Sequence, residues 1–99
     1  MTPQEYFAEL LDFYAHGMDV MRAKNADYAD KEDPFKNFRA SELVGVDPAR
    51  AILVRITDKL ARVSNLLDNE AMVDDEKIED TLLDMANYIN ILHAYLQQE

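Results

Sequence analysis

The sequence predicts an all-α protein, a small helical bundle of three main helices and one short helix. Apolar residues recur three and four positions apart along most of the chain, and no alternating strand pattern extends beyond a few residues. The 99 residues are 48% hydrophobic and 30% charged, with only two Gly and three Pro, which excludes disordered and collagen-like chains. We expect a single domain over residues 1–99, because a second core could not bury enough surface at this length.

The first helix is predicted over about residues 3–24. Thr2, Pro3 and Glu5 form a capping-box pattern with Pro at the first helical position. Beyond it, apolar side chains recur on one face of the helix, at Phe7, Leu10, Leu11, Tyr14, Met18 and Met21. Lys24 falls on the same side as Leu10, so its ammonium group either points into a site or extends to water.

The stretch "KNADYADKEDPFKNF", residues 24–38, is predicted as a non-helical run between two helices. A plain connector would need only turn residues, but this run carries charged, amide and aromatic side chains: Lys24, Asp27, Tyr28, Phe35, Lys36, Asn37 and Phe38. After it, "RASELVGV" predicts a short turn of helix that begins at Ser41 and ends at Gly45.

The second main helix is predicted over residues 48–69. Asp47 and Pro48 form an N-cap and first-turn pair. The main apolar stripe of this helix is Ile52, Ile56, Leu60, Val63 and Leu67. Arg55, Asp58 and Arg62 share the opposite side, where Ala51, Val54 and Ala61 would let another helix approach closely.

The last helix is predicted over residues 76–98, capped by Asp74 or Asp75, and it carries the most informative polar residues. Asp80, Asp84 and Asn87 share one side of it. Asp84 falls inside a broad apolar arc, and burial of an unpaired carboxylate costs several kcal/mol, so it needs a cation, a donor or a proton. Two interpretations stay open: an oxygen ligand set for Mg²⁺ or Mn²⁺, and an ion pair with Arg or Lys.

Charge and composition restrict the partners. Twenty acidic against ten basic residues give a net charge of -10, which disfavours direct binding of nucleic acid. The absence of Cys excludes disulfides and thiolate metal sites. Without a basic leader or an apolar run of about 20 residues, we expect a cytoplasmic protein that does not contact membranes.

Three segments in order, "KNADYADKEDPFKNF", "RITDKLARVSNLL" and "EDTLLDMANYINIL", resemble the nucleotide-modification-associated domain found in phages and bacteria. That family is similar to the all-α NTP pyrophosphohydrolases of the MazG-like group. The resemblance covers about residues 20–96, and it implies a MazG-like bundle in the host cytoplasm if the chain is phage-encoded.

The resemblance implies a Mg²⁺-dependent hydrolysis of a (deoxy)nucleoside triphosphate to a monophosphate and pyrophosphate. The implied metal ligands are Asp58, Asp80 and Asp84, and the implied catalytic residues are Asp58, Asp84 and Lys59. Phosphate contacts would come from Lys24, Arg55, Lys59 and Arg62. Tyr28 or Phe38 would stack on the base, Asn87 would contact the sugar or complete the metal shell, and Asp27 and Tyr88 would complete the substrate-binding set.

Two other functions stay open. A protein with the same pocket could bind a nucleotide or a cyclic nucleotide without cleaving it, and so act as a sponge against host defence. Alternatively, the chain could be a structural helical module, in which Asp58, Asp80 and Asp84 pair with Arg55, Arg62 and Lys24. In each case we expect a homodimer or homotetramer, since the apolar residues around the last helix exceed what one neighbour can cover.

Overall fold

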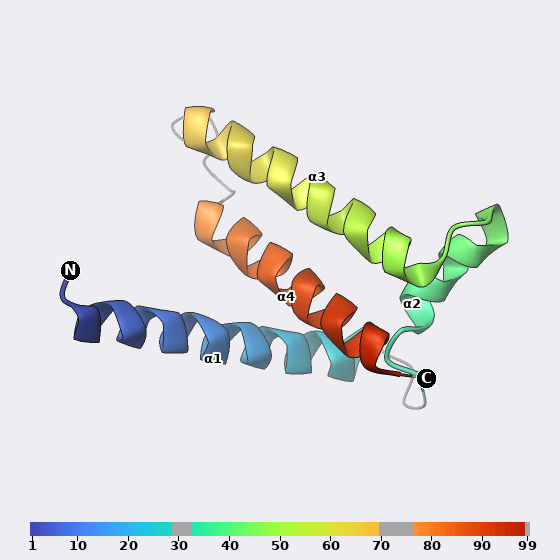
Figure 1. The fold of residues 1–99 in the computed structure, drawn as a ribbon, viewed down its shortest axis with the longest axis horizontal. Helices are drawn as coiled ribbons and strands as arrows, with labels where there is room; N and C mark the ends of the chain where they lie inside the picture. The colour runs from blue at the N-terminus through green and yellow to red at the C-terminus, as the bar shows by residue number, and fades with distance from the viewer. Residues whose placement is uncertain (29–32, 70–76, 99) are drawn as a thin grey trace.

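The computed structural model describes residues 1–28, 33–69 and 77–98, and it describes side chains throughout these ranges except at 26–28. The elements are α1 (Pro3–Tyr28), α2 (Lys36–Arg39), the 3-10 helix η1 (Ala40–Val44), α3 (Pro48–Asn69) and α4 (Ile78–Gln97). Figure 1 shows α3 and α4 side by side, with α1 meeting the other side of α4. No strand occurs in the described ranges, so the all-α prediction is confirmed, and no helix in them has the length and apolarity to cross a bilayer.

Helix α1 begins where the capping pattern predicted and ends later than predicted. The Glu5 backbone N–H donates to the Thr2 hydroxyl at 3.1 Å. The helix then continues to Tyr28, about one turn beyond the predicted end, because no Gly or Pro interrupts the chain after Gly17 until Pro34. The prediction that residues 24–38 form one non-helical run is therefore wrong at both ends, where 24–28 belong to α1 and 36–38 to α2.

The connection into α3 and the bounds of α3 are as predicted. Gly45 adopts a left-handed conformation with φ of 77° and ends η1, which starts at Ala40, one residue before Ser41. The Arg50 backbone N–H donates to Asp47 Oδ1 at 2.9 Å, so Asp47 caps the helix that starts at Pro48. These boundaries depend on local hydrogen bonds, and local sequence therefore fixes them.

Helix α4 begins at Ile78, two residues later than predicted. Lys77 stands at the N-cap position with extended backbone and makes no capping side-chain hydrogen bond. Asp74 and Asp75 lie outside the described residues, and their capping role stays a prediction.

The core lies between α3 and α4, and it is small. Its buried apolar side chains among the described residues are Ile52, Val63, Leu66 and Leu83. The prediction was wrong for Leu60 and Leu67, which are exposed, while Leu66 is buried. The apolar arc of α3 is wider than one neighbour can cover, and α4 contacts the flank that carries Leu66 and Lys59.

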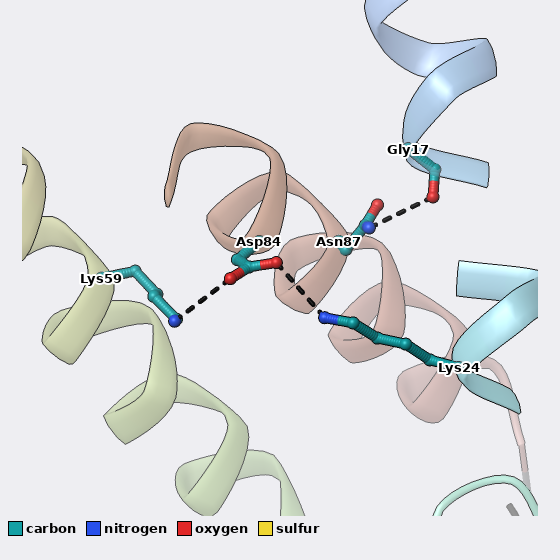
Figure 2. A network of polar contacts seen from close by, with 5 residues as sticks. All are labelled: Gly17, Lys24, Lys59, Asp84 and Asn87. Carbon is teal, nitrogen blue, oxygen red and sulfur yellow. Dashed lines mark hydrogen bonds and ion pairs between the residues drawn. The ribbon is translucent and has the colours of Figure 1, made fainter. Parts of the chain in front are cut away.

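Helices α1 and α4 approach closely at Gly17. The Asn87 side-chain N–H donates to the Gly17 carbonyl at 3.2 Å, and Asn87 is buried (Figure 2). A Cβ at position 17 would lie 3.0 Å from Asn87 Oδ1 and 3.2 Å from Leu83 Cδ1. The absence of a side chain at Gly17 thus sets how near α1 comes to the polar side of α4.

Candidate functional site

Asp84 lies at the centre of the polar contacts between the three main helices. Its Oδ1 is 3.4 Å from Lys24 Nζ of α1, and its Oδ2 is 3.2 Å from Lys59 Nζ of α3 (Figure 2). The exposed fractions of the side chains are 28% for Asp84, 20% for Lys59 and 60% for Lys24. The half-buried carboxylate is thus compensated by two ammonium groups, one of which, Lys24, is the partner that the helical-module alternative predicted.

A cavity of about 640 Å³ opens between α1, the α2 segment and α4, beside this ion pair. We call it the aromatic pocket, because Phe35, Phe38 and Tyr88 form part of its wall. The other apolar side chains that line it are Met18, Met21, Pro34, Ile91 and Ala94. Its polar lining is Lys24, Asn25, Asn37, Asp84, Asn87, Asn90 and His93. A flat apolar group and hydrogen-bonding groups can therefore be accommodated together.

Aromatic contacts fix the α2 segment against α4. The ring of Phe38 stands edge-on to Tyr88, with centroids 6.2 Å apart and planes at 83°. The ring of Phe35 makes a similar contact with Tyr95 at 5.4 Å and 78°. Pairs of this geometry contribute about 0.5–1.5 kcal/mol beyond the area that they bury. Phe35 and Phe38 therefore attach the α2 segment to α4 and also line the pocket.

Arg39 reinforces this attachment. Its guanidinium lies 5.8 Å from the centre of the Tyr95 ring, within cation–π range. Its Nε is 2.6 Å from Asp33 Oδ2, and this hydrogen bond to a carboxylate raises the pKa of Arg39 further above its ordinary value. Asp33 and Arg39, which flank Phe35 and Phe38, thus attach this segment by an ion pair as well as by ring contacts.

A second, smaller hollow of about 140 Å³ lies between α3 and α4. We call it the basic hollow, because three cations and one carboxylate line it together with Tyr88: Arg55, Lys59, Arg62 and Asp58. The sequence placed Arg55, Asp58 and Arg62 opposite the buried stripe of α3. The buried stripe is in fact rotated toward Lys59, so these side chains lie at the rim of the α3–α4 contact.

The two hollows are neighbours. Tyr88 lines both of them, and Lys59 of the basic hollow contacts Asp84 of the aromatic pocket. An aromatic cavity and a cationic hollow on two sides of one tyrosine can bind one ligand that has a flat ring at one end and negative charge at the other.

Most of the predicted site residues gather in these two places. The aromatic pocket contains Lys24, Phe38, Asp84, Asn87 and Tyr88, and the basic hollow contains Arg55, Asp58, Lys59 and Arg62. Asp80 is exposed and lines neither hollow. Asp27 and Tyr28 belong to the last turn of α1, but their side chains are outside the description, and their predicted contacts stay predictions.

The predicted metal ligands do not gather in the same way. Among the described residues, no three His, Cys, Asp or Glu side chains form a group that could hold a metal ion. Asp58, Asp80 and Asp84 are all described, and Asp84 faces two lysines. The arrangement does not by itself fit Mg²⁺ or Mn²⁺, so a metal site stays a prediction.

Some residues of the pocket were not identified from the sequence. Asn25, Asn90 and His93 line it, and none of them was among the predicted site residues. A signal was present, because Asn90 is three residues from Asn87 and so shares its side of the helix. The pocket lies across the boundary between the apolar and polar faces of α4. A prediction that treats each residue as either buried or exposed does not identify residues at such a boundary.

Comparisons of the chain with protein-family models, with curated proteins and with solved structures gave no match. The resemblance to the MazG-like group stays a prediction, and the arrangement of the aromatic pocket and the basic hollow is the basis for a function.

Proposed function

We propose that the protein binds a nucleoside phosphate, with the base in the aromatic pocket and the phosphates at the basic hollow. The observation that supports this most is the shared lining residue Tyr88, which puts an aromatic cavity next to a cluster of three cations. A nucleotide has the same two chemical parts, a flat ring and an anionic phosphate group.

The aromatic pocket suits a base. Its volume of about 640 Å³ falls within the range of about 300–1,000 Å³ that is typical of small-molecule sites. Stacking of a base on an aromatic side chain contributes about 1–3 kcal/mol. The amides of Asn25, Asn37 and Asn90 offer both donors and acceptors to ring nitrogens and carbonyls.

The basic hollow suits phosphates. In a chain with a net charge of -10, an anion needs a local concentration of positive charge to bind. Arg55, Lys59 and Arg62 provide it on successive turns of α3, next to a single carboxylate, Asp58. Hydrogen bonds from arginine to phosphate are charge-assisted and geometrically specific.

In the free protein, the Asp84 carboxylate makes ion pairs that compete with the binding of a phosphate. The Asp84 carboxylate contacts Lys59 of the basic hollow and Lys24 of the aromatic pocket. A phosphate bound at the basic hollow must therefore share Lys59 with Asp84 or displace the carboxylate.

Calorimetric titration with a panel of nucleoside mono-, di- and triphosphates, in the presence of a chelator, tests the proposal. We expect binding that Arg55→Ala weakens at least about tenfold, since a lost charge-assisted hydrogen bond costs about 1.5–3 kcal/mol. Arg22→Ala is the matched control, because it removes the same charge from an exposed site that lines neither hollow. If no nucleotide binds at millimolar concentration, or if both variants bind as the wild type does, the proposal is wrong.

Hydrolysis to a monophosphate and pyrophosphate is the second candidate. It is favoured by one observation: Asp58 lines the basic hollow beside Lys59, and Lys59 in turn contacts Asp84, so two of the implied catalytic acids flank the proposed phosphate position. The same panel, incubated with Mg²⁺ and assayed for released pyrophosphate, decides it. Turnover that Asp58→Asn abolishes would establish an enzyme, and recovery of the intact nucleotide would leave a binding protein.

A further inference from the structure

The first half of α1 extends away from the rest of the molecule. Residues 1–12 are all exposed, and Figure 1 shows the N-terminal half of α1 diverging from α4. Six large apolar side chains along α1, each 40–70% exposed, form what we call the α1 stripe: Tyr6, Phe7, Leu10, Leu11, Tyr14 and Met18. They recur at helical spacing and so lie along one side of the helix.

This arrangement is poorly stabilised in a single chain. Helical segments of fewer than about 12–15 residues are marginal in water unless an apolar face packs against something. Glu5, Glu9 and Asp12 occupy the other side of the same turns, so the stripe is apolar without interruption. Such an exposed apolar strip in a protein marks a surface that another molecule covers.

Two global quantities indicate how much surface needs covering. The accessible surface is 7820 Å², about 2,000 Å² more than a folded monomer of this mass exposes on average. The radius of gyration is 15.5 Å, whereas a compact domain of this length has about 13 Å. Both values describe a chain that is too open to be a complete folded unit.

We propose that a second copy of this chain covers the α1 stripe, in a symmetric pair in which each α1 packs against its partner. The excess surface of the whole chain, of which the α1 stripe is part, amounts to about 4,000 Å² for two chains, which is enough to supply the roughly 2,000–5,000 Å² that obligate homodimers bury. Self-association about a two-fold axis lets one stripe serve both partners. An anionic bilayer does not suit this surface, because the chain carries a net charge of -10.

The interface continues to the edge of the aromatic pocket. Met18 belongs to the α1 stripe and also lines the pocket. A partner packed along the stripe therefore borders the pocket at Met18, although the pairing itself does not depend on what the pocket binds.

Sedimentation of the full chain at micromolar concentrations tests the pairing. We expect a mass of twice the 11.4 kDa of one chain. The double variant Phe7→Glu, Leu11→Glu should weaken association at least about tenfold, because it places charge at two buried anchors. His16→Glu adds a negative charge to an exposed position on the polar side of α1 and should leave association unchanged. A wild-type monomer, or a pair that the double variant leaves intact, overturns the proposal.

Hydrogen exchange of the wild-type protein provides a test that does not depend on how the variants fold. The backbone amides of residues 6–12 should exchange more slowly as the concentration rises through the association range. Fast exchange of these amides in the associated protein would place the interface elsewhere and overturn the proposal. A tetramer that the double variant reduces to a dimer would still support an interface at the stripe.

Discussion

Replacing Asp84 by Asn should have opposite effects on the stability of the free protein and on its affinity for a nucleotide. The change keeps the shape of the side chain but removes the charge that contacts Lys24 at 3.4 Å and Lys59 at 3.2 Å. Exposed ion pairs contribute about 0.2–1 kcal/mol each, and the Lys59 pair, which is the less exposed of the two, belongs near the upper end. We expect a loss of about 1 kcal/mol of unfolding free energy in total.

The same substitution leaves Lys59 at the proposed phosphate position, and Lys24 at the aromatic pocket, without their carboxylate partner. A phosphate no longer has to break the ion pairs of Asp84 when it binds. The free energy of those ion pairs therefore adds to the binding free energy of the phosphate. About 1 kcal/mol corresponds to an affinity that is about fivefold higher. Thermal denaturation of the free protein and calorimetric titration with ATP in a chelator measure the two effects.

Asp80→Asn is the control for this experiment. Asp80 lies one turn earlier on α4, is exposed and lines neither hollow, so it changes the net charge equally without touching the site. We expect Asp80→Asn to leave both quantities nearly unchanged. Weaker ATP binding by Asp84→Asn, with Asp80→Asn unaffected, would refute competition between Asp84 and phosphate and would favour a direct role of the carboxylate in binding.

Three further predictions follow from the geometry. Gly17→Ala should lower the unfolding free energy by about 1 kcal/mol in denaturant titration, since crowding against Asn87 outweighs the better helix propensity of Ala; a more stable variant would show that α1 can shift freely. Phe38→Leu should weaken nucleotide binding about tenfold but leave inorganic triphosphate binding unchanged in calorimetry, and an equal loss for both ligands would contradict base stacking. The backbone N–H and side chain of Arg50 lower the pKa of Asp47 below its ordinary 3.8, so its stabilising effect is complete above that value and is lost as the pH falls through the lowered pKa. Asp47→Asn should therefore show a smaller acid-induced fall in melting temperature than the wild type, and identical falls would contradict this.

Features set by neighbouring residues were predictable from the sequence. The N-caps at Thr2 and Asp47 and the left-handed Gly45 are short-range features, and the helix bounds that depend on them agree with prediction. The predicted end of α1 was wrong, because charged and aromatic side chains alone do not indicate a loop and nothing in residues 24–28 prevents a helix. Tyr28 is thus helical, and only its backbone is described.

Features that depend on how the helices pack were predicted less well. The half-buried state of Asp84 followed from the helical wheel, and Lys24 was among the basic partners of the helical-module alternative. The contact with Lys59 depends on the side of α3 that α4 meets. The same rotation buries Leu66 in place of Leu67. A helical wheel of one helix gives the width of its apolar arc. Which side chains within that arc are buried depends on where the neighbouring helix packs.

The most direct test of the account follows the backbone amides of the isotope-labelled protein by NMR while ATP is added. We expect the signals of Phe38 and Tyr88 at the aromatic pocket and of Arg55 and Arg62 at the basic hollow to shift together, with one apparent affinity. Shifts confined to one hollow, or centred on another surface, would contradict a nucleotide site that spans both.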